Sequence, residues 1–244
     1  MEQEKIKILH LYYDLMNLYG DWANVAVMER ELMAHGFEVV VDKKSVGDDI
    51  DFTDYDFLCI GSGTERSRLA CMKDLAQYKD TLIERIEVGI PMLATGNSHE
   101  LFGKAVTDSN RIRYDMLGLL DFETVQLNTR VTGDCVCMAS FLEEKLIGFI
   151  NRAGGRQKGD LNRPFSIEPQ EGASYAACSE GIRHKNLIGT YLTGPVLVRN
   201  PPFLRYFADI ICGATKQKNR PPASRLFEYQ EKAYRTTLNE MEQN

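Results

Sequence analysis

The sequence predicts an α/β fold, with a mostly parallel sheet that helices cover on both faces. Three observations support this. Short apolar runs alternate with helical patterns through the first half of the chain, the runs are apolar at nearly every position, and turn-forming glycines separate them. Strands that are apolar on both sides fit a sheet buried on both faces. We expect such strands at residues 6–11, 37–41, 56–60 and 91–95.

Helices are expected between these strands and at the end of the chain. A helical spacing of apolar residues covers 22–34, a second helix is capped by Thr64 or Ser67 and runs to about Val88, and a short helix covers 97–104. The second half is richer in strand patterns, at 122–130, 135–139, 146–150, 173–178 and 187–192, which we interpret as hairpins and additions to the sheet. The last helices are expected at 201–212 and 223–241.

The composition is that of a soluble globular protein with one main domain. Apolar residues make up 43% and charged residues 26% of the 244 residues, which is ordinary for a chain that buries a full core. We expect one domain over 1–215, followed at 216–244 by a basic linker and a helix that packs on it. Lys216, Lys218, Arg220 and Arg225 lie among prolines there, which favours a solvated linker over a local basic patch.

Charge and hydropathy argue against several functional classes. A net charge of −6 disfavours a nucleic-acid-binding surface. The charged start and the lack of a long apolar run predict a cytoplasmic protein without membrane insertion. The six cysteines lack the spacing of a disulfide framework, so we expect reduced thiols. Cys135 and Cys137 share a strand face, but no second pair has metal-ligand spacing, and we expect neither metal nor cofactor.

Ligands of a sheet of this kind bind beyond the carboxyl ends of its strands, where the loops 12–20, 61–66 and 95–98 are expected to meet. The glycines at 61 and 63 leave two interpretations open. Their backbone N–H groups can hold a ligand or an oxyanion, or the loop is a plain strand-to-helix turn.

Residues 95–98 predict a sharp strand-to-helix junction with the geometry of a nucleophile elbow. The residue at the elbow is Gly96, which has no nucleophile to present. A catalytic pair of Ser98 and His99 is the alternative. It is disfavoured because adjacent residues on a helix point in different directions, so Ser98 is interpreted as a cap or first-turn residue.

Four segments resemble one family and together span nearly the whole chain. They are 11–24 (LYYDLMNLYGDWAN), the loop from 61, 91–103 and 180–201, of which the run NLIGTYLTGP at 186–195 is the most specific. They resemble the cobyric-acid-synthase-like glutamine amidotransferases of the class I type, and among these the glutaminase subunits of lipid II isoglutaminyl synthases. The resemblance implies a flavodoxin-like fold. It also implies a cysteine that attacks glutamine, a histidine that activates it, and transfer of ammonia to a Mur-ligase-like, ATP-dependent subunit that amidates the D-glutamate of lipid II.

The resemblance fails at both catalytic positions. The family elbow Cys-Gly-Gly-Tyr-Gln-Leu-Leu-Gly is GNSHELFG at 96–103, so Gly96 takes the cysteine position. The family run Gly-Thr-Tyr-Leu-His-Gly-Pro is GTYLTGP at 189–195, so Thr193 takes the histidine position. The positions that the resemblance implies for binding glutamine are Gly61, Gly63, Asn97, Arg130 and Asn151.

We therefore predict that glutaminase activity is lost, because Gly96 supplies no attacking atom and the Thr193 hydroxyl cannot take up a proton near neutral pH. Cys59 and Cys178 lie in apolar runs and are expected to be buried, so neither replaces the nucleophile. The first hypothesis is a non-catalytic scaffold or regulatory subunit in a heterodimer with a Mur-ligase-like enzyme.

Two alternatives remain open. One is an enzyme of changed chemistry that uses a tightly ordered polar cluster at the strand ends, formed by Ser98, His99, Glu100 or Arg152. The other is a sensor of glutamine or a related amino acid that binds through Arg130 and the loop at 61.

Overall fold

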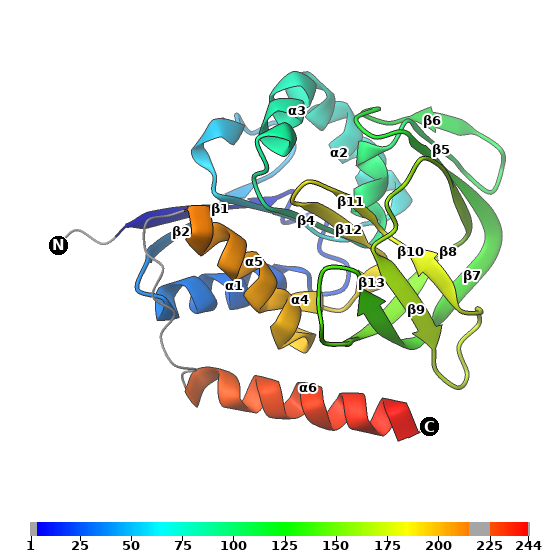
Figure 1. Ribbon diagram of the computed structural model, residues 1–244. Helices are drawn as coiled ribbons and strands as arrows, with labels where there is room; N and C mark the ends of the chain where they lie inside the picture. The colour runs from blue at the N-terminus through cyan, green and yellow to red at the C-terminus, as the bar shows by residue number, and fades with distance from the viewer. Residues whose placement is uncertain (1–3, 215–224, 244) are drawn as a thin grey trace.

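The structure, a computed structural model, describes residues 4–214 and 225–243 and contains two sheets. The first sheet has the strand order β11-β12-β4-β3-β1-β2. The second has the order β10-β9-β7-β5-β6, with β8 paired to β7 and β13 to β8. In Figure 1 the first sheet lies between layers of helices and the second sheet stands beside it on the right. The predicted linker residues Lys216, Lys218 and Arg220 lie outside the described residues.

The first sheet confirms the predicted parallel core. Its parallel strands are β1 (Lys5–Leu11), β2 (Glu38–Lys44), β3 (Phe57–Ile60), β4 (Met92–Thr95) and β12 (Leu187–Thr190). A short antiparallel strand, β11 (Ile182–His184), closes one edge. Side chains of each central strand alternate between two cores: Ile6 and Ile8 of β1 face one, and Leu9 and Leu11 face the other. A sheet that is apolar on both faces needs cover on both.

Helices supply that cover from both sides, as predicted. One face packs against α1 (Trp22–Ala34) and α5 (Pro201–Ala214), and the other against α2 (Glu65–Leu75), α3 (Lys79–Glu87) and the 3-10 segment η3 (Gly96–Phe102). The prediction of one continuous helix up to Val88 is wrong, because the chain forms two helices there, α2 and α3. The 3-10 turn η2 (Ala76–Tyr78) separates the two helices.

The second-half strands form a sheet of their own, with β5 (Ala105–Thr107), β6 (Arg113–Asp115), β7 (Phe122–Ala139), β8 (Leu146–Gly159), β9 (Phe165–Pro169), β10 (Cys178–Glu180) and β13 (Leu192–Thr193). The strands predicted at 122–130 and 135–139 are one long strand, β7. Its pairing with β8 continues through the polar stretch between them, with an irregularity between Leu127 and Arg130.

Two further strand predictions need correction. Residues 173–177 are not a strand, because Ser174 folds back onto β7 and exchanges hydrogen bonds with Thr132. The pattern at 187–192 is split between β12 in the first sheet and β13 in the second, with Tyr191 at the crossing point. Periodicity cannot show that consecutive residues belong to different sheets.

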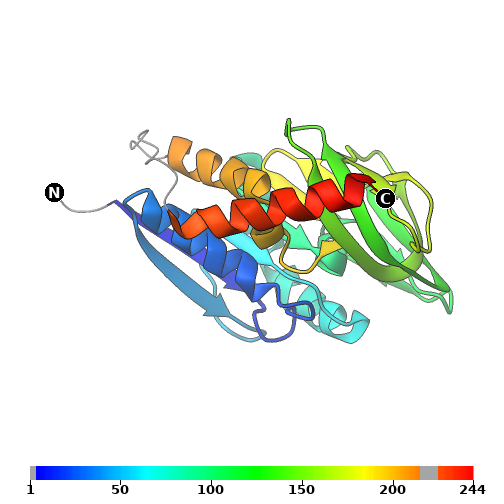
Figure 2. The ribbon, with the colours of Figure 1, turned by 90° about the horizontal axis from the view of Figure 1, so that it is seen from below.

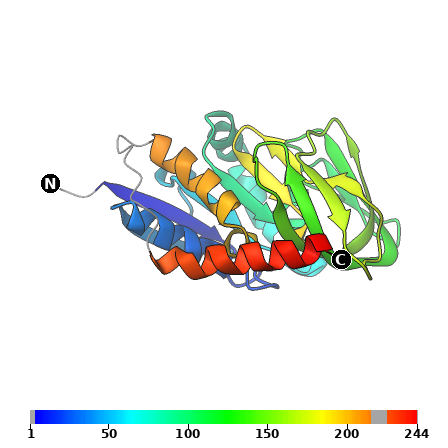
Figure 3. The ribbon, with the colours of Figure 1, turned by 60° about the horizontal axis from the view of Figure 1, so that its bottom comes forward.

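The C-terminal helix α6 (Arg225–Gln243) runs from beside α1 to the second sheet (Figures 2 and 3). Its Tyr234 hydroxyl donates a hydrogen bond of 2.5 Å to the carbonyl of Lys145, and Gln230 donates to the carbonyls of Leu197 and Val198 near α4 (Val196–Arg199). The division of the chain at 215 remains a prediction. Among the described helices, none combines the length and apolar character that a membrane span requires.

Candidate functional site

A cavity of about 220 Å³ lies beyond the carboxyl ends of β3 and β4, where the sequence places the site. Five of the predicted site residues line it: Gly63, Gly96, Asn97, Arg130 and Asn151. Gly61 and Thr193 do not. Because Thr95 of β4 pairs with Thr190 of β12, the two positions predicted to replace the catalytic residues follow neighbouring strands at the same end of the sheet.

Gly96 adopts a backbone conformation that side chains disfavour, with φ of 59°. The space that its side chain would need is occupied. A Cβ placed on Gly96 would overlap the hydroxyl oxygen of Ser62 and lie 2.7 Å from the Ser62 Cβ. Ser62 is itself buried, and its hydroxyl has no hydrogen-bond partner among the described residues. Gly96, which the resemblance places at the nucleophile position, therefore has no side-chain atom, and Ser62 occupies the space that one would need.

Thr193 uses its hydroxyl within the fold. It pairs with Phe149 across β13 and β8, and its Oγ1 donates a 3.0 Å hydrogen bond to the carbonyl of Phe149. The side chain is buried. A hydroxyl committed to a strand neighbour contributes to the sheet, not to proton transfer.

The glycine loop does not offer the free N–H groups that the sequence led us to expect. The amide of Ser62 donates to Asp21 at 3.1 Å, and that of Gly63 donates to the side chain of Asn97 at 3.0 Å. Asn97 in turn donates to the carbonyl of Gly63 at 2.8 Å. These bonds tie the loop at 61–66 to Asp21 and to Asn97 of the elbow, and they leave the amides of Ser62 and Gly63 unavailable to an oxyanion.

The glycines at 61 and 63 are required by close packing. A Cβ on Gly61 would overlap the carbonyl oxygen of Met16 and the side chain of Asp21, and a Cβ on Gly63 would overlap the sulfur of Met16. The structure thus supports a packing reason for both glycines, since the loop at 12–20 presses directly against them.

Asp21 joins the three loops that the sequence predicted would meet. Its buried carboxylate accepts hydrogen bonds from the Thr95 hydroxyl at 2.5 Å and from the Ser62 amide. Burial raises the pKa of this carboxyl group above its usual value, and the hydrogen bonds oppose that shift. Asp21 lies in the resembling segment 11–24, but no local pattern distinguishes it from other acidic residues.

The disfavoured Ser98–His99 pair does not form, because each side chain bonds to other groups. The Ser98 hydroxyl lies 2.8 Å from the carbonyl oxygen of Thr95 and 3.1 Å from that of Ile60, as a first-turn residue would. His99 is fully buried, and burial lowers its pKa to about 3. Its Nε2 lies 3.0 Å from the amide nitrogen of Gln157, which fits a neutral ring accepting a hydrogen bond.

A buried polar network includes two residues of the cavity lining, Glu100 and Tyr191. Arg68 forms an ion pair with Glu100, and the Tyr191 hydroxyl donates to the same carboxylate at 2.6 Å. The guanidinium carbon of Arg152 lies 4.5 Å from the centre of the Tyr191 ring. Arg68 was missed because an arginine in a helical pattern is usually solvent-exposed.

Glu180 bonds to the chain where it passes from β12 in the first sheet to β13 in the second. It accepts hydrogen bonds from the Thr190 hydroxyl at 2.5 Å and from the Tyr191 amide at 2.9 Å. Burial raises its pKa to about 7. This carboxyl group fixes the backbone that places Tyr191 at the cavity.

Arg130 and Asn151, which the resemblance implies bind glutamine, lie together in the lining of the cavity. Arg130 Nε donates to Asn151 Oδ1 at 2.5 Å, and Arg130 Nη2 donates to the Tyr19 hydroxyl at 3.3 Å. The Tyr19 hydroxyl also donates to the Asn151 carbonyl at 3.3 Å. All partners of Arg130 in this cluster are uncharged.

The cysteines divide into buried and accessible thiols. Cys59 is buried as expected, with its pKa raised by burial, whereas Cys178 is exposed on β10, so its predicted burial is wrong. Cys178 lies at the edge of the second sheet, since β10 pairs with β9 alone. Within 4–214 and 225–243, no group of three His, Cys, Asp or Glu side chains is placed to hold a metal ion.

Comparisons with known proteins agree with this architecture. Residues 7–201 match the CobB/CobQ-like glutamine amidotransferase domain. The chain is 31% identical over 208 residues to the lipid II isoglutaminyl synthase (glutamine-hydrolyzing) subunit GatD of Staphylococcus aureus (strain N315), covering 85% of each chain. It is 30% identical over 198 residues to the subunit of the same name from Streptococcus pneumoniae (strain ATCC BAA-255 / R6), covering 80% of this chain and 76% of that one.

Among solved structures, the chain is similar to the glutaminase domain of Trypanosoma brucei CTPS with bound acivicin. The TM-score is 0.47 and the identity 10%, over 90% of this chain and 98% of that one. With a domain match over most of its length and two relatives at 30% identity or more, the chain belongs to the CobB/CobQ-like glutamine amidotransferase domain family.

Proposed function

We propose that this chain is a cytoplasmic glutaminase-like subunit that no longer hydrolyses glutamine and acts as a scaffold or regulator of a Mur-ligase-like, ATP-dependent enzyme. One observation carries the proposal: Gly96 stands at the elbow, and Ser62 fills the space that a nucleophile there would need. The relatives named above are subunits of a lipid II isoglutaminyl synthase, which supports a heterodimer acting in amidation of peptidoglycan D-glutamate.

The chemistry of amide hydrolysis explains why the family reaction is lost. A covalent mechanism needs a nucleophile activated by an adjacent base, and loss of such a nucleophile lowers turnover on the order of a millionfold. The Ser62 hydroxyl is near the position, but no described side chain accepts a hydrogen bond from it. Thr193 donates its own proton to a carbonyl and cannot act as a base.

The direct test is release of ammonia from glutamine by the purified chain, alone and in the presence of its co-purified ligase. We expect no release above background together with a stable complex. Turnover that persists after mock-purified controls are subtracted would overturn the proposal and indicate a replacement nucleophile.

Restoring variants test the structural reason for the loss. We expect Gly96→Cys/Thr193→His to stay inactive, because the new Cβ overlaps Ser62. Adding Ser62→Gly removes that overlap, so only the triple variant is expected to recover measurable hydrolysis. If the double variant hydrolysed glutamine as fast as the triple variant, Ser62 would not block the position.

An amino-acid sensor is the second candidate, and the Arg130–Asn151–Tyr19 cluster favours it. A guanidinium with only neutral partners at a cavity mouth can bind a carboxylate. Calorimetry with glutamine, glutamate and the variant Arg130→Ala tests this, with glutamine binding in the wild type as the supporting result. The network around Glu100 is the polar cluster that changed chemistry would require, but its groups bond to one another.

A further inference from the structure

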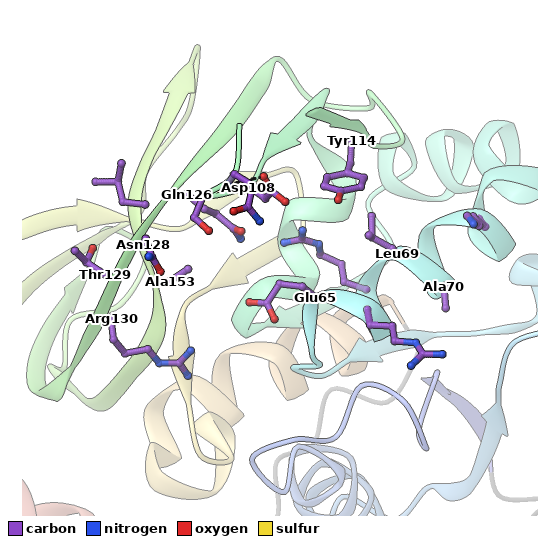
Figure 4. A pocket seen from close by; sticks show the side chains of 16 residues that line it. Glu65, Leu69, Ala70, Asp108, Tyr114, Gln126, Asn128, Thr129, Arg130 and Ala153 are labelled. Atoms are coloured by element: carbon purple, nitrogen blue, oxygen red, sulfur yellow. Dashed lines mark hydrogen bonds between the residues drawn. The ribbon is translucent and has the colours of Figure 1, made fainter. Parts of the chain in front are cut away.

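A groove of about 950 Å³ lies beside the cavity, between α2 and the middle of β7. In Figure 4, Leu69 and Ala70 of α2 lie on one side of it, and Gln126, Asn128 and Thr129 of β7 lie on the other. The groove shares Arg130 with the cavity but is larger and more open.

The β7 wall of this groove is an unpaired strand edge. One edge of β7 is covered by β8 from Phe122 to Cys137, so β5 and β9 must both pair with the other edge. The pairing with β5 ends at Val125, and the pairing with β9 begins at Cys135. The backbone of the loop at 170–174 bonds to Thr132 and Asp134, and the Ser174 hydroxyl also reaches the carbonyl of Arg130 at 3.4 Å. Residues 126–131 have no neighbouring strand on this side.

The open stretch is long enough for a peptide. Six residues of strand span about 20 Å, and an extended segment placed there can form main-chain hydrogen bonds along its length. The irregularity in the β7–β8 register leaves Asn128 and Thr129 without a partner residue in β8 as well. An edge strand that faces a helix across a groove is the arrangement by which peptides add to a sheet.

The opposite wall is positively charged. Arg66, Leu69, Ala70 and Lys73 follow the helical spacing and present one face of α2 to the groove. Arg66 and Lys73 are exposed and form no ion pair with any residue in the described ranges. Two acidic residues also line the groove: Glu65, exposed at the start of α2, and Asp108, whose carboxylate accepts hydrogen bonds from the amides of Asn110 and Ile112. The basic lining residues Arg66, Lys73 and Arg130 outnumber them.

The groove also contains an unsatisfied donor. Arg68 lines it, is almost fully buried, and has an Nε without a hydrogen-bond partner among the described residues. Buried donors are normally paired, so this one indicates an acceptor that arrives with a ligand. The local excess of positive charge contrasts with the net charge of −6 of the whole chain.

We propose that this groove binds an extended acidic segment of a partner polypeptide, which adds as a strand beside residues 126–131. Main-chain hydrogen bonds to the β7 edge hold the segment, and its carboxylates lie near Arg66, Lys73 and Arg130. The inference goes beyond the proposed function and does not depend on it, because the groove is the same whether or not glutamine is hydrolysed.

Fluorescence anisotropy with the full chain tests the proposal. The probe is a labelled peptide of about eight alternating glutamate and valine residues, and the controls are its lysine analogue and a short single-stranded oligonucleotide. We expect saturable binding of the acidic peptide alone. No binding of it at millimolar protein, or equal binding of the lysine peptide, would overturn the proposal. Preferential binding of the oligonucleotide would also overturn it and indicate a nucleic-acid partner.

Two comparisons separate strand addition from simple charge attraction. Arg66→Glu/Lys73→Glu is expected to weaken binding by at least about tenfold, while the matched charge change Arg30→Glu/Lys232→Glu, on helices away from the groove, leaves it within about twofold. A peptide N-methylated at alternate residues keeps its charge but loses donors, and we expect it to bind at least about tenfold more weakly. Unchanged binding of the N-methylated peptide would rule out strand addition.

Hydrogen exchange gives an independent readout. The amides of residues 126–131 should become protected when the acidic peptide is present, and those of the paired stretch 135–139 should not change. Protection elsewhere without protection here would also contradict the proposed position.

Discussion

The cavity at Gly96 and the groove beside α2 share a wall, yet their polar groups are used in opposite ways. In the cavity wall, Glu100 and Tyr191 are buried and bonded to each other, and Glu100 also pairs with the buried Arg68, which lines the groove. In the groove, Arg66 and Lys73 are exposed and have no charged partner among the described residues. Burial requires polar groups to satisfy one another, whereas exposed charges remain available to a ligand. The proposed loss of the family site and the proposed peptide site in the groove both depend on this difference.

Breaking the buried ion pair should have the largest effect. Arg68→Met removes one partner and leaves the Glu100 carboxylate buried without its counter-charge, so we expect a loss of about 3–5 kcal/mol in the free energy of unfolding. Chemical denaturation measures this loss. The double variant Arg68→Met/Glu100→Gln removes both charges and should be less destabilised than the single variant. If the single change cost under 1 kcal/mol, the network would not be a structural element.

The second-largest effect concerns Glu180 and has a defined pH dependence. Burial raises the pKa of this group from 4.5 to about 7, so its ionisation is penalised in the folded state only. This contribution to stability is fully present below pH 4.5 and is lost as the pH rises through about 7, by at most about 3 kcal/mol. Glu180→Gln abolishes the dependence.

The free energy of unfolding of Glu180→Gln relative to the wild type should therefore increase between pH 5 and pH 8, as measured by denaturation at several pH values. A difference that stays constant over this range would show that Glu180 has the same pKa in the folded and unfolded states. Asp51 offers a control, because hydrogen bonds from Thr53 lower the pKa of its exposed carboxyl group below the usual 3.8, so its contribution is lost only in acid and Asp51→Asn should show a constant difference between pH 5 and pH 8.

The smallest effect is expected in the groove. Arg66→Gln and Lys73→Gln remove exposed charges without ion-pair partners among the described residues, so each should change the free energy of unfolding by less than about 0.5 kcal/mol. Thermal denaturation checks this. A larger loss would mean that these charges stabilise the fold, and the contrast between groove and cavity would then be weaker than proposed.

Periodicity was sufficient for the parallel core and insufficient for the second sheet. The strands at 6–11 and 91–95 were predictable because their side chains are buried on both faces, so the local pattern carries the full signal. The polar middle of β7 was not predictable, because its own residues have no strand pattern and it is held in strand conformation by pairing with β8. Cys178 looked buried in the sequence but lies on an edge strand.

The sequence by itself determined which residues stand at the two positions that the resemblance makes catalytic. Gly96 has no nucleophilic atom and Thr193 no basic one, whatever surrounds them. Only the tertiary structure decided which side chains surround these positions and which strand edges lie nearby. Ser62 fills the space beside Gly96 although the two are far apart in the chain, and the open edge of β7 exists only because β5 and β9 stop short of each other. Residue identity is local, whereas occupied space and unpaired edges depend on how distant segments pack.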